Sequence, residues 1–126
     1  MPPPSYTLYV PAGSFRAFPT LIAAAYNAIE IQTITDGIEE LAKSKSPTGK
    51  APLLTTSTSS VVLFSSASIV RYIACLRRDT GLLGRTLLEQ AVVESWMEWA
   101  TQTLELPACV LWYPIAGFMS QVAPEA

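Results

Sequence analysis

The stretch TGKAPLLTTSTSSVVLFSSASIVRYIA, residues 48–74, determines the fold of this chain. It reads as a strand over residues 53–56, a Ser/Thr-rich turn, a second strand over residues 61–64 and a helix over residues 66–76. Two β-rich runs joined by a short polar turn predict a hairpin. The apolar spacing that follows them predicts a helix that packs on the hairpin.

Three residues of this stretch are candidates for holding a ligand. Pro52 fixes φ and removes a backbone donor just before the first strand. When such an X-Pro bond is cis, the backbone of the preceding residue can face a peptide-like ligand. Ser65 and Ser66 lie where the second strand becomes a helix, and hydroxyls and amides at a helix start can hold a carboxylate.

The residues before this stretch predict a β-α-β unit and a short helix. We expect a strand over residues 6–10, a helix over residues 14–26, a second strand over residues 29–34 and a helix over residues 36–42. A β-α-β unit of this size is normally parallel and right-handed. The whole order therefore predicts an α/β fold, a thioredoxin-like mixed sheet of about four strands covered by helices.

Several residues are expected to begin, end or orient these helices. Ser14 is expected to cap the first helix and Asp36 the second. Asn27 is expected to end the first helix, because asparagine tolerates left-handed geometry. The first helix should cover the sheet with the residues that share one face: Phe18, Leu21, Ile22 and Ala25.

Composition excludes several classes of site. The 126 residues are half hydrophobic and carry a formal charge of −2, which gives no reason to expect direct nucleic-acid binding. The absence of histidine removes Ser-His-Asp and Cys-His nucleophile systems and most zinc sites, so no metal is expected. Cys75 and Cys109 are far apart and form no CxxC pair, and we expect both to be small buried hydrophobes.

The start of the chain does not resemble a secretory signal. Residues 1–5 are neither basic nor followed by a long apolar run. No apolar run is long enough to span a membrane. We therefore expect a protein of the reducing cytoplasm.

Residues 86–106 form the most strongly helical region of the sequence. Apolar residues occupy most of the circumference of this helix and leave only a narrow polar strip. A helix of this kind is buried on more than one side. The chain ends soon afterwards, so either a further C-terminal half or another protein chain is expected to cover the helix.

We expect two domains. Residues 1–80 would form the α/β domain, and the Gly-containing segment after it would be a linker. Residues 85–126 would begin a second, all-helical domain, which looks truncated.

Three blocks give the chain a resemblance to a known family. They are TLYV with FRAFPTLIAAAYNA (residues 7–28), GKAPLL with LFSSASIVRYIA, and VVESWMEWATQTLELPACVLWYPIAG (residues 92–117). The chain resembles the glutathione S-transferase-like (GST-like) domains of the translation machinery. These include the N-terminal domains of elongation factor 1-gamma and of valyl- and methionyl-tRNA synthetases. The resemblance implies a GST N-terminal domain followed by the first helix or two of the all-α C-terminal half.

The resemblance also implies a vestigial glutathione site. Pro52 and Ser66 match the family pattern, whereas Ser65 stands where active transferases usually have Glu or Gln. This difference makes glutathione a weak ligand at most, and no other cofactor is implied. Ser14 is the only hydroxyl placed like a catalytic residue, just after the first strand.

A non-catalytic interaction module is the leading functional hypothesis. It would assemble translation components, of the elongation factor 1 complex or of a multi-synthetase complex, as a homo- or heterodimer of GST-like domains. The expected interface residues are aromatic anchors with charged neighbours: Arg71, Tyr72, Trp96, Glu98, Trp99, Trp112 and Tyr113. For each tryptophan, packing within the domain is the alternative.

Two other functions are considered. The first is an active glutathione transferase that conjugates glutathione to electrophiles, with Ser14 as the catalytic hydroxyl. The second, a thiol–disulfide protein, lacks the CxxC pair that exchange requires. The domain itself is expected not to be an enzyme, although its parent protein could be an aminoacyl-tRNA synthetase.

Overall fold

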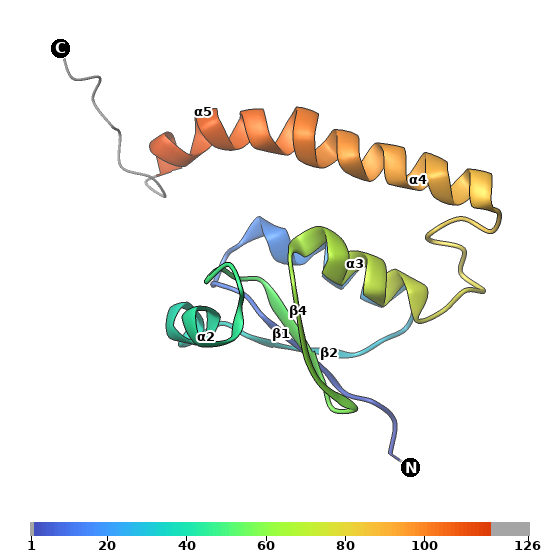
Figure 1. Cartoon of the computed structure of the whole chain (residues 1–126), viewed down its shortest axis with the longest axis horizontal. Helices are drawn as coiled ribbons and strands as arrows, with labels where there is room; N and C mark the ends of the chain where they lie inside the picture. The colour runs from blue at the N-terminus through green and yellow to red at the C-terminus, as the bar shows by residue number, and fades with distance from the viewer. Residues whose placement is uncertain (1, 117–126) are drawn as a thin grey trace. The chain divides into compact units, whose positions relative to one another are not determined.

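A computed structural model describes residues 2–116 of the chain. The elements in chain order are β1 (Tyr6–Tyr9), η1 (Phe15–Ala17), α1 (Phe18–Tyr26), β2 (Ile31–Ile34), α2 (Ile38–Lys45), β3 (Leu53–Thr56), β4 (Ser59–Phe64), α3 (Ser66–Cys75), α4 (Leu87–Trp99), η2 (Ala100–Glu105) and α5 (Leu106–Ala116) (Figure 1). They fall into two compact units. We call Met1–Arg85 the sheet unit and Thr86–Ala126 the helical unit.

The sheet unit contains a four-stranded mixed sheet. Its strands are ordered β2-β1-β3-β4. β1 and β2 run parallel, as a β-α-β unit requires, while the β1–β3 and β3–β4 pairs are antiparallel. This is the thioredoxin-like arrangement that the sequence predicts.

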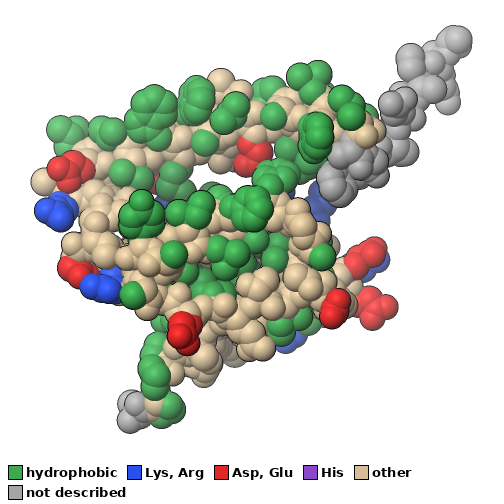
Figure 2. Space-filling view, turned by 180° about the vertical axis from the view of Figure 1, so that it is seen from behind, with side chains coloured by type: hydrophobic (Ala, Val, Ile, Leu, Met, Phe, Trp, Pro, Cys, Tyr) green, Lys and Arg blue, Asp and Glu red, His purple; other side chains and the backbone are tan. Residues whose placement is uncertain are grey.

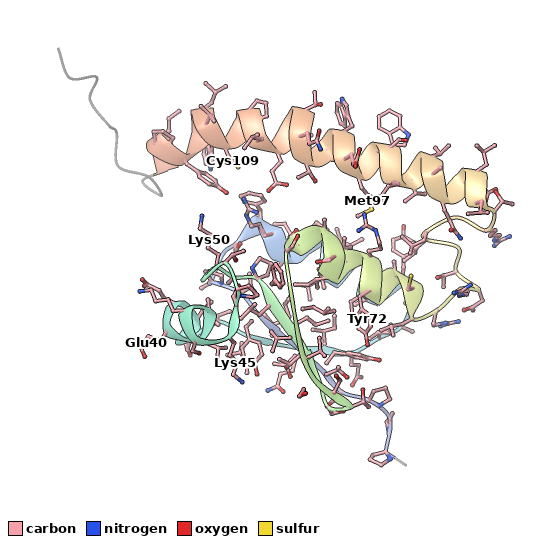
Figure 3. All side chains as sticks on the ribbon, in the orientation of Figure 1. Glu40, Lys45, Lys50, Tyr72, Met97 and Cys109 are labelled. Carbon is pink, nitrogen blue, oxygen red and sulfur yellow. The ribbon has the colours of Figure 1, made fainter. Side chains whose placement is uncertain are left out.

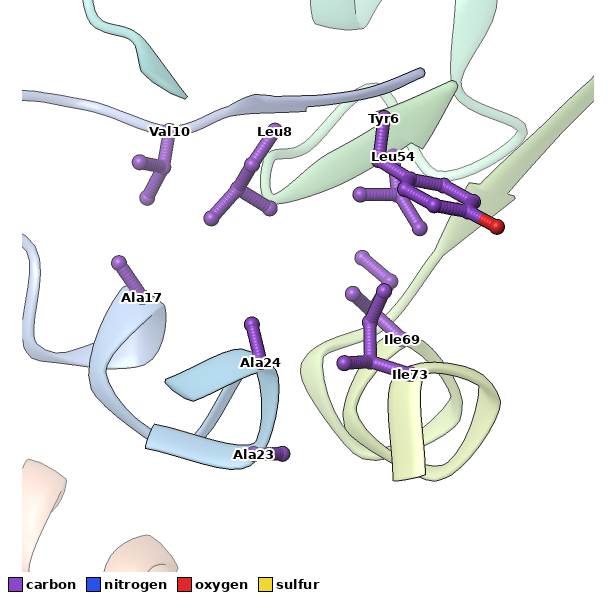
Figure 4. Packing of buried hydrophobic residues seen from close by; sticks show 9 residues of the cluster. All are labelled: Tyr6, Leu8, Val10, Ala17, Ala23, Ala24, Leu54, Ile69 and Ile73. Atoms are coloured by element: carbon purple, nitrogen blue, oxygen red, sulfur yellow. The ribbon is translucent and has the colours of Figure 1, made fainter. Parts of the chain in front are cut away.

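The core lies between the sheet and the layer formed by η1, α1 and α3. Figure 4 shows strand side chains pointing toward these helices, which contact one another. The cluster consists of Tyr6, Leu8, Val10, Ala17, Ala23, Ala24, Leu54, Ile69 and Ile73. The α1 side contributes only alanines to this cluster, so α1 can approach the sheet closely.

The expected face of α1 is wrong for three of its four residues, since Ala25 is exposed and so are two of the large residues. Phe18 is 59% exposed and Ile22 is 57% exposed, and the smaller Thr20 and Ala24 are buried in their place. Phe18, Ile22 and Tyr26 follow one another at four-residue spacing, so they form an exposed apolar stripe. The periodicity was present, but the side of the helix that carries small residues is the one that faces inward.

The first helix begins with a short 3-10 turn and not with a regular α-helical turn. Ser14 caps that turn, since its hydroxyl accepts the backbone N–H of Arg16 at 3.4 Å. The α-helix proper starts at Phe18. Pro19 therefore falls in the first turn, where its missing N–H leaves no bond unmade.

Asn27 ends α1 as its C-cap, as expected, but not in left-handed geometry, because its φ is −90° and the positive φ of 53° falls on Ala28. The cap expected for the second helix is wrong. Asp36 does not cap α2. The N-cap of α2 is Gly37, which has a φ of 66°. Glycine adopts such a positive φ without steric cost.

Within the described residues, the helical unit is one continuous helical run that extends beyond the predicted end at residue 106. Thr86 starts it with a capping box, in which Thr86 and Glu89 each bond the other's backbone N–H. The run widens into the π-helical segment η2 just before Pro107. Pro107 has no N–H to complete an α-helical turn, which accounts for the irregularity there. Gly117, quoted in the third block, lies outside the described residues.

The expected burial of the cysteines is also wrong. Cys75 ends α3 on the solvent side and is exposed, while Cys109 in α5 is half-buried. Ile69 and Ile73 of α3 occupy the inward face that a buried Cys75 would have needed.

Candidate functional site

The register of the sheet aligns three strand ends. Tyr9 at the end of β1 pairs with Leu53 at the start of β3. Leu53 pairs in turn with Phe64 at the end of β4. We call this the site end of the sheet, because the segments adjoining it carry the predicted ligand-holding residues: Ser14, Pro52, Ser65 and Ser66.

Pro52 lies at the start of β3 and is buried. The peptide bond between Ala51 and Pro52 is cis. Lys50 precedes them in the loop after α2 and is exposed (Figure 3). The site end thus combines a buried proline with an exposed cationic side chain.

The turn from β4 into α3 has an unusual backbone. Ser65 has φ 75° and ψ 125° and makes no side-chain cap bond. A non-glycine residue with positive φ costs energy, and such residues cluster at ligand sites and switches. The hydroxyl of Ser68 donates to the carbonyls of Phe64 and Ser65, at 2.6 and 3.1 Å. These carbonyls are therefore bonded within the turn, and the side chain of Ser65 is exposed.

Ser66 opens α3 and is half-buried. The backbone N–H groups in the first turn of a helix have no partner within the helix. They also lie at the positive end of the helix dipole. Ser66 therefore lies at a helix start of the kind that can hold a carboxylate, and that role stays a prediction.

Ser14 is half-buried in the connection between β1 and α1. Its hydroxyl accepts from Arg16, and its own N–H donates to the carbonyl of Pro11 at 3.1 Å. The guanidinium of Arg16 lies 5.6 Å from the ring centre of Phe15. The contacts of Ser14 are therefore those of a cap, while its hydroxyl proton can still be donated.

Arg71 and Tyr72 of α3 are both half-buried. The ring of Tyr72 meets that of Tyr6 edge to face, with centroids 6.3 Å apart. Burial, followed by the interaction with Tyr72, raises the pKa of the Tyr6 hydroxyl above its ordinary value. Tyr72 thus packs within the sheet unit, in addition to any part it has at an interface.

A buried polar cluster around Asn27 was not predicted as functional. The Asn27 side-chain amide donates to the carbonyls of Ile73 at 2.9 Å and Ala74 at 3.2 Å. Its side-chain oxygen accepts from the hydroxyl of Thr80, and its backbone carbonyl accepts from Arg77 at 3.3 Å. We call this set the Asn27 clasp. It ties the end of α1 to the end of α3 and the segment beyond, and the only sequence signal was an asparagine at the end of an apolar helix.

The helical unit carries the predicted aromatic anchors in exposed positions. The rings of Trp96 and Trp99 meet edge to face with centroids 5.7 Å apart, and their side chains are 64% and 46% exposed. Trp112 and Glu98 are also exposed, while Tyr113 is half-buried. The tryptophans therefore do not form a core within the described part of the chain.

Among residues 2–116, no cluster of His, Cys, Asp or Glu is arranged to hold a metal ion. In the same range, no helix combines the length and apolarity needed to cross a membrane.

Comparison with known proteins identifies the relatives of the chain. No protein-family profile matches it. It is 35% identical over 125 residues to probable elongation factor 1-gamma 1 of Arabidopsis thaliana, covering 93% of this chain and 29% of that protein. It is also 40% identical over 58 residues to glutathione S-transferase GstB of Escherichia coli, covering 46% of this chain and 28% of that protein. The chain thus spans less than a third of the length of these relatives.

The fold has solved counterparts. Poplar glutathione transferase F1 superposes with a TM-score of 0.73 at 23% identity, over 96% of this chain and 59% of that one. At this level of identity the likeness concerns the fold alone, and it agrees with the strand order and helix placement described above. Sequence similarity and fold together show that the chain is a GST-like domain, similar to that of translation proteins of the elongation factor 1-gamma family.

Proposed function

We propose that the chain is a non-catalytic GST-like interaction module that helps to assemble translation components in the cytoplasm. The observation that carries this proposal is the exposed aromatic surface of the helical unit in a chain whose relatives are elongation factor 1-gamma proteins. Buried tryptophans dominate the binding energy of many protein interfaces. An exposed apolar surface of this kind lowers the solubility of a protein unless a partner covers it.

The partners proposed are other GST-like domains of translation proteins. Elongation factor 1 subunits are favoured over aminoacyl-tRNA synthetases, because the translation proteins found by the comparison are of the elongation factor type. A synthetase as parent protein remains a prediction from the third sequence block.

Affinity capture from a cell lysate, quantified by mass spectrometry, tests the module. The wild-type chain should enrich elongation factor subunits, and Trp96→Ala/Trp99→Ala should lose most of that enrichment. Val61→Ala is the matched control, since it removes an apolar side chain that is 61% exposed on the sheet unit. Equal capture by the double variant, or no translation component in any sample, would overturn the proposal.

Glutathione transfer is the second candidate function. It is favoured by the site end, where the register brings together the strand ends whose adjoining segments carry Ser14, Pro52 and Ser66. The Ser14 hydroxyl would donate to the glutathione sulfur and stabilise its thiolate, and the start of α3 would hold a carboxylate.

Conjugation of glutathione to a generic electrophile, followed by absorbance, tests the second candidate. Activity that falls at least about tenfold in Ser14→Ala, with unchanged circular dichroism, would support transfer. Ser44→Ala on α2 is the matched control. Absence of turnover above the uncatalysed rate would leave the interaction module as the function.

A further inference from the structure

The two outer strands of the sheet, β2 and β4, differ in how open they are to a further strand. On β4 the register with β3 shifts between Leu54 and Thr56, so the ladder is irregular there. The hydroxyl of Ser59 also accepts the backbone N–H of Val61, at 3.1 Å. An irregular ladder that twists an edge strand is one way in which proteins keep that edge from pairing. The edge of β4 is therefore protected against pairing.

β2, in contrast, has a regular ladder. It pairs with β1 in unbroken parallel register from Ile31 to Ile34. Its sequence, IQTI, includes no proline and no charged side chain. Natural proteins use both kinds of residue to blunt exposed edge strands. We call the outer side of β2 the open edge of the sheet.

The backbone of β2 presents hydrogen-bonding groups to the open edge. The carbonyl of Ile34 accepts the N–H of Val10, which follows β1, at 3.1 Å, so Ile34 faces β1. Along a strand, successive residues turn their N–H and C=O groups to opposite sides. Gln32 therefore also faces β1, whereas Ile31 and Thr33 turn their N–H and C=O groups to the open edge. Both residues are thus placed to bond the backbone of an added strand.

The charge around β2 is acidic. Glu30 lies just before the strand and Asp36 shortly after it, and both are exposed. Glu39 and Glu40 follow at the start of α2, and residues 17–42 include no Lys or Arg. Pairing of this edge with its own copy would bring acidic groups together, which is unfavourable. A basic strand is therefore the complementary partner.

We propose that the open edge binds an extended, basic segment of a partner protein, which adds to the sheet as a further strand beside β2. Strand addition to an exposed sheet edge is a recurring mode of peptide recognition, in which main-chain hydrogen bonds supply affinity. Here a Lys or Arg at each end of the segment would meet Glu30 and Asp36. The inference goes beyond the proposed function, because it needs none of the hydrophobic side chains that stand along the helical unit in Figure 2.

Titration of the whole ¹⁵N-labelled chain with the peptide acetyl-KTVTVTK-amide, followed by NMR, tests the site. The peptide carries its lysines at the spacing of Glu30 and Asp36. We expect saturable binding with a Kd below about 1 mM, and the largest shifts at the amides of Ile31 and Thr33. The matched peptide acetyl-ETVTVTE-amide should bind at least about tenfold more weakly. No shift on β2 with the basic peptide, or larger shifts on β4, would overturn the proposal.

N-methylated peptides test the backbone bonds directly. Methyl groups on the valine nitrogens and methyl groups on the threonine nitrogens block opposite sides of the added strand. One of these two peptides should bind at least about tenfold more weakly than the parent, and the other should keep most of its affinity. The sensitive set reports the direction in which the peptide pairs with β2. Equal affinities of the two methylated peptides would show that the peptide does not bind as a strand.

Charge reversal tests the two acidic ends. Glu30→Lys/Asp36→Lys should weaken binding of acetyl-KTVTVTK-amide about tenfold, because both attractive pairs become repulsive. Glu39→Lys/Glu40→Lys is the matched control, since it makes the same charge change on α2 and should weaken binding less than about threefold. Circular dichroism checks that both variants are folded. Equal losses in the two variants would contradict the placement of the partner along β2, whereas the capture experiment above tests the tryptophans independently of this edge.

Discussion

The sheet unit and the helical unit differ in where their apolar side chains go. Every buried apolar residue found in the described part of the chain belongs to the sheet unit. In the helical unit, none of the residues 86–115 is buried. Most of the stability of a helix in a protein comes from packing its apolar face. The sheet unit therefore has a core of its own, whereas residues 86–115 of the helical unit form none.

The largest expected effect is the difference in stability cost between removing a buried apolar side chain of the sheet unit and removing an exposed one of the helical unit. Ile73→Ala removes a fully buried side chain of the sheet unit and should lower the free energy of unfolding by about 2–5 kcal/mol. Leu111→Ala in the helical unit, where the side chain is 73% exposed, should change it by no more than about 0.5 kcal/mol. Urea unfolding at low protein concentration measures both. Equal costs would show that the helical unit has a core of its own.

The second largest effect compares a buried amide side chain of the sheet unit with an exposed amide of the helical unit. Asn27→Leu leaves the carbonyls of Ile73 and Ala74 without the amide that binds them, and should cost at least about 2 kcal/mol. Gln102→Leu also introduces a leucine, here in place of an exposed amide of the helical unit. It should leave the free energy of unfolding nearly unchanged. The two unfolding midpoints in urea give the comparison. An Asn27→Leu variant as stable to urea as the wild type would mean that the Asn27 clasp does not stabilise the fold.

A smaller effect is expected at the start of the helical unit. Thr86→Ala removes the capping box and should cost the helix about 1 kcal/mol. Hydrogen exchange should quicken for the first turn of α4 and stay unchanged in β1 and β3. Thr101→Ala is the control, because its hydroxyl only returns to the carbonyl of Met97 within the helix. If hydrogen exchange in the first turn of α4 were slower or unchanged in Thr86→Ala, the stabilising role of the capping box would be contradicted.

The smallest effect concerns pH and the sheet unit alone. Burial raises the pKa of the Tyr6 hydroxyl above 10.0, so its neutral form is favoured in the folded chain. The stability from this group is complete below the ordinary pKa and is lost as the pH rises through the folded pKa. Ultraviolet absorbance of tyrosinate should show a late titration step that Tyr6→Phe removes. A titration curve unchanged by Tyr6→Phe would contradict the shift.

Elements set by local chemistry were predicted well from the sequence. β3 was expected over residues 53–56 and occupies those residues, because a proline precedes it and a polar turn follows. The helix expected from residue 86 is likewise present, and in the structure Thr86 begins it with a capping box. The thioredoxin-like sheet followed from the order of such segments.

Features set by tertiary contacts were not predictable in this way. The inward face of α1 was misjudged, because large apolar residues were expected to be buried and the sheet in fact accepts Thr20 and Ala24. The Asn27 clasp joins residues more than forty positions apart, which no local pattern encodes. At the candidate site the ligand-holding roles of the serines and Pro52 stay predictions, and the meeting of three strand ends beside them required the register of the sheet.

The Asn27 clasp also determines how mechanical load would travel through the molecule. Along the chain, the helical unit is joined to the sheet unit by the segment after α3. Thr80 and Arg77 of that segment are both bonded to Asn27. A force would therefore be taken up first by a buried amide at the base of two helices, before it reaches the strands. The clasp would thus act as an anchor point, and the residues beyond Thr80 as the tether by which an assembly could hold this domain without pulling its sheet apart.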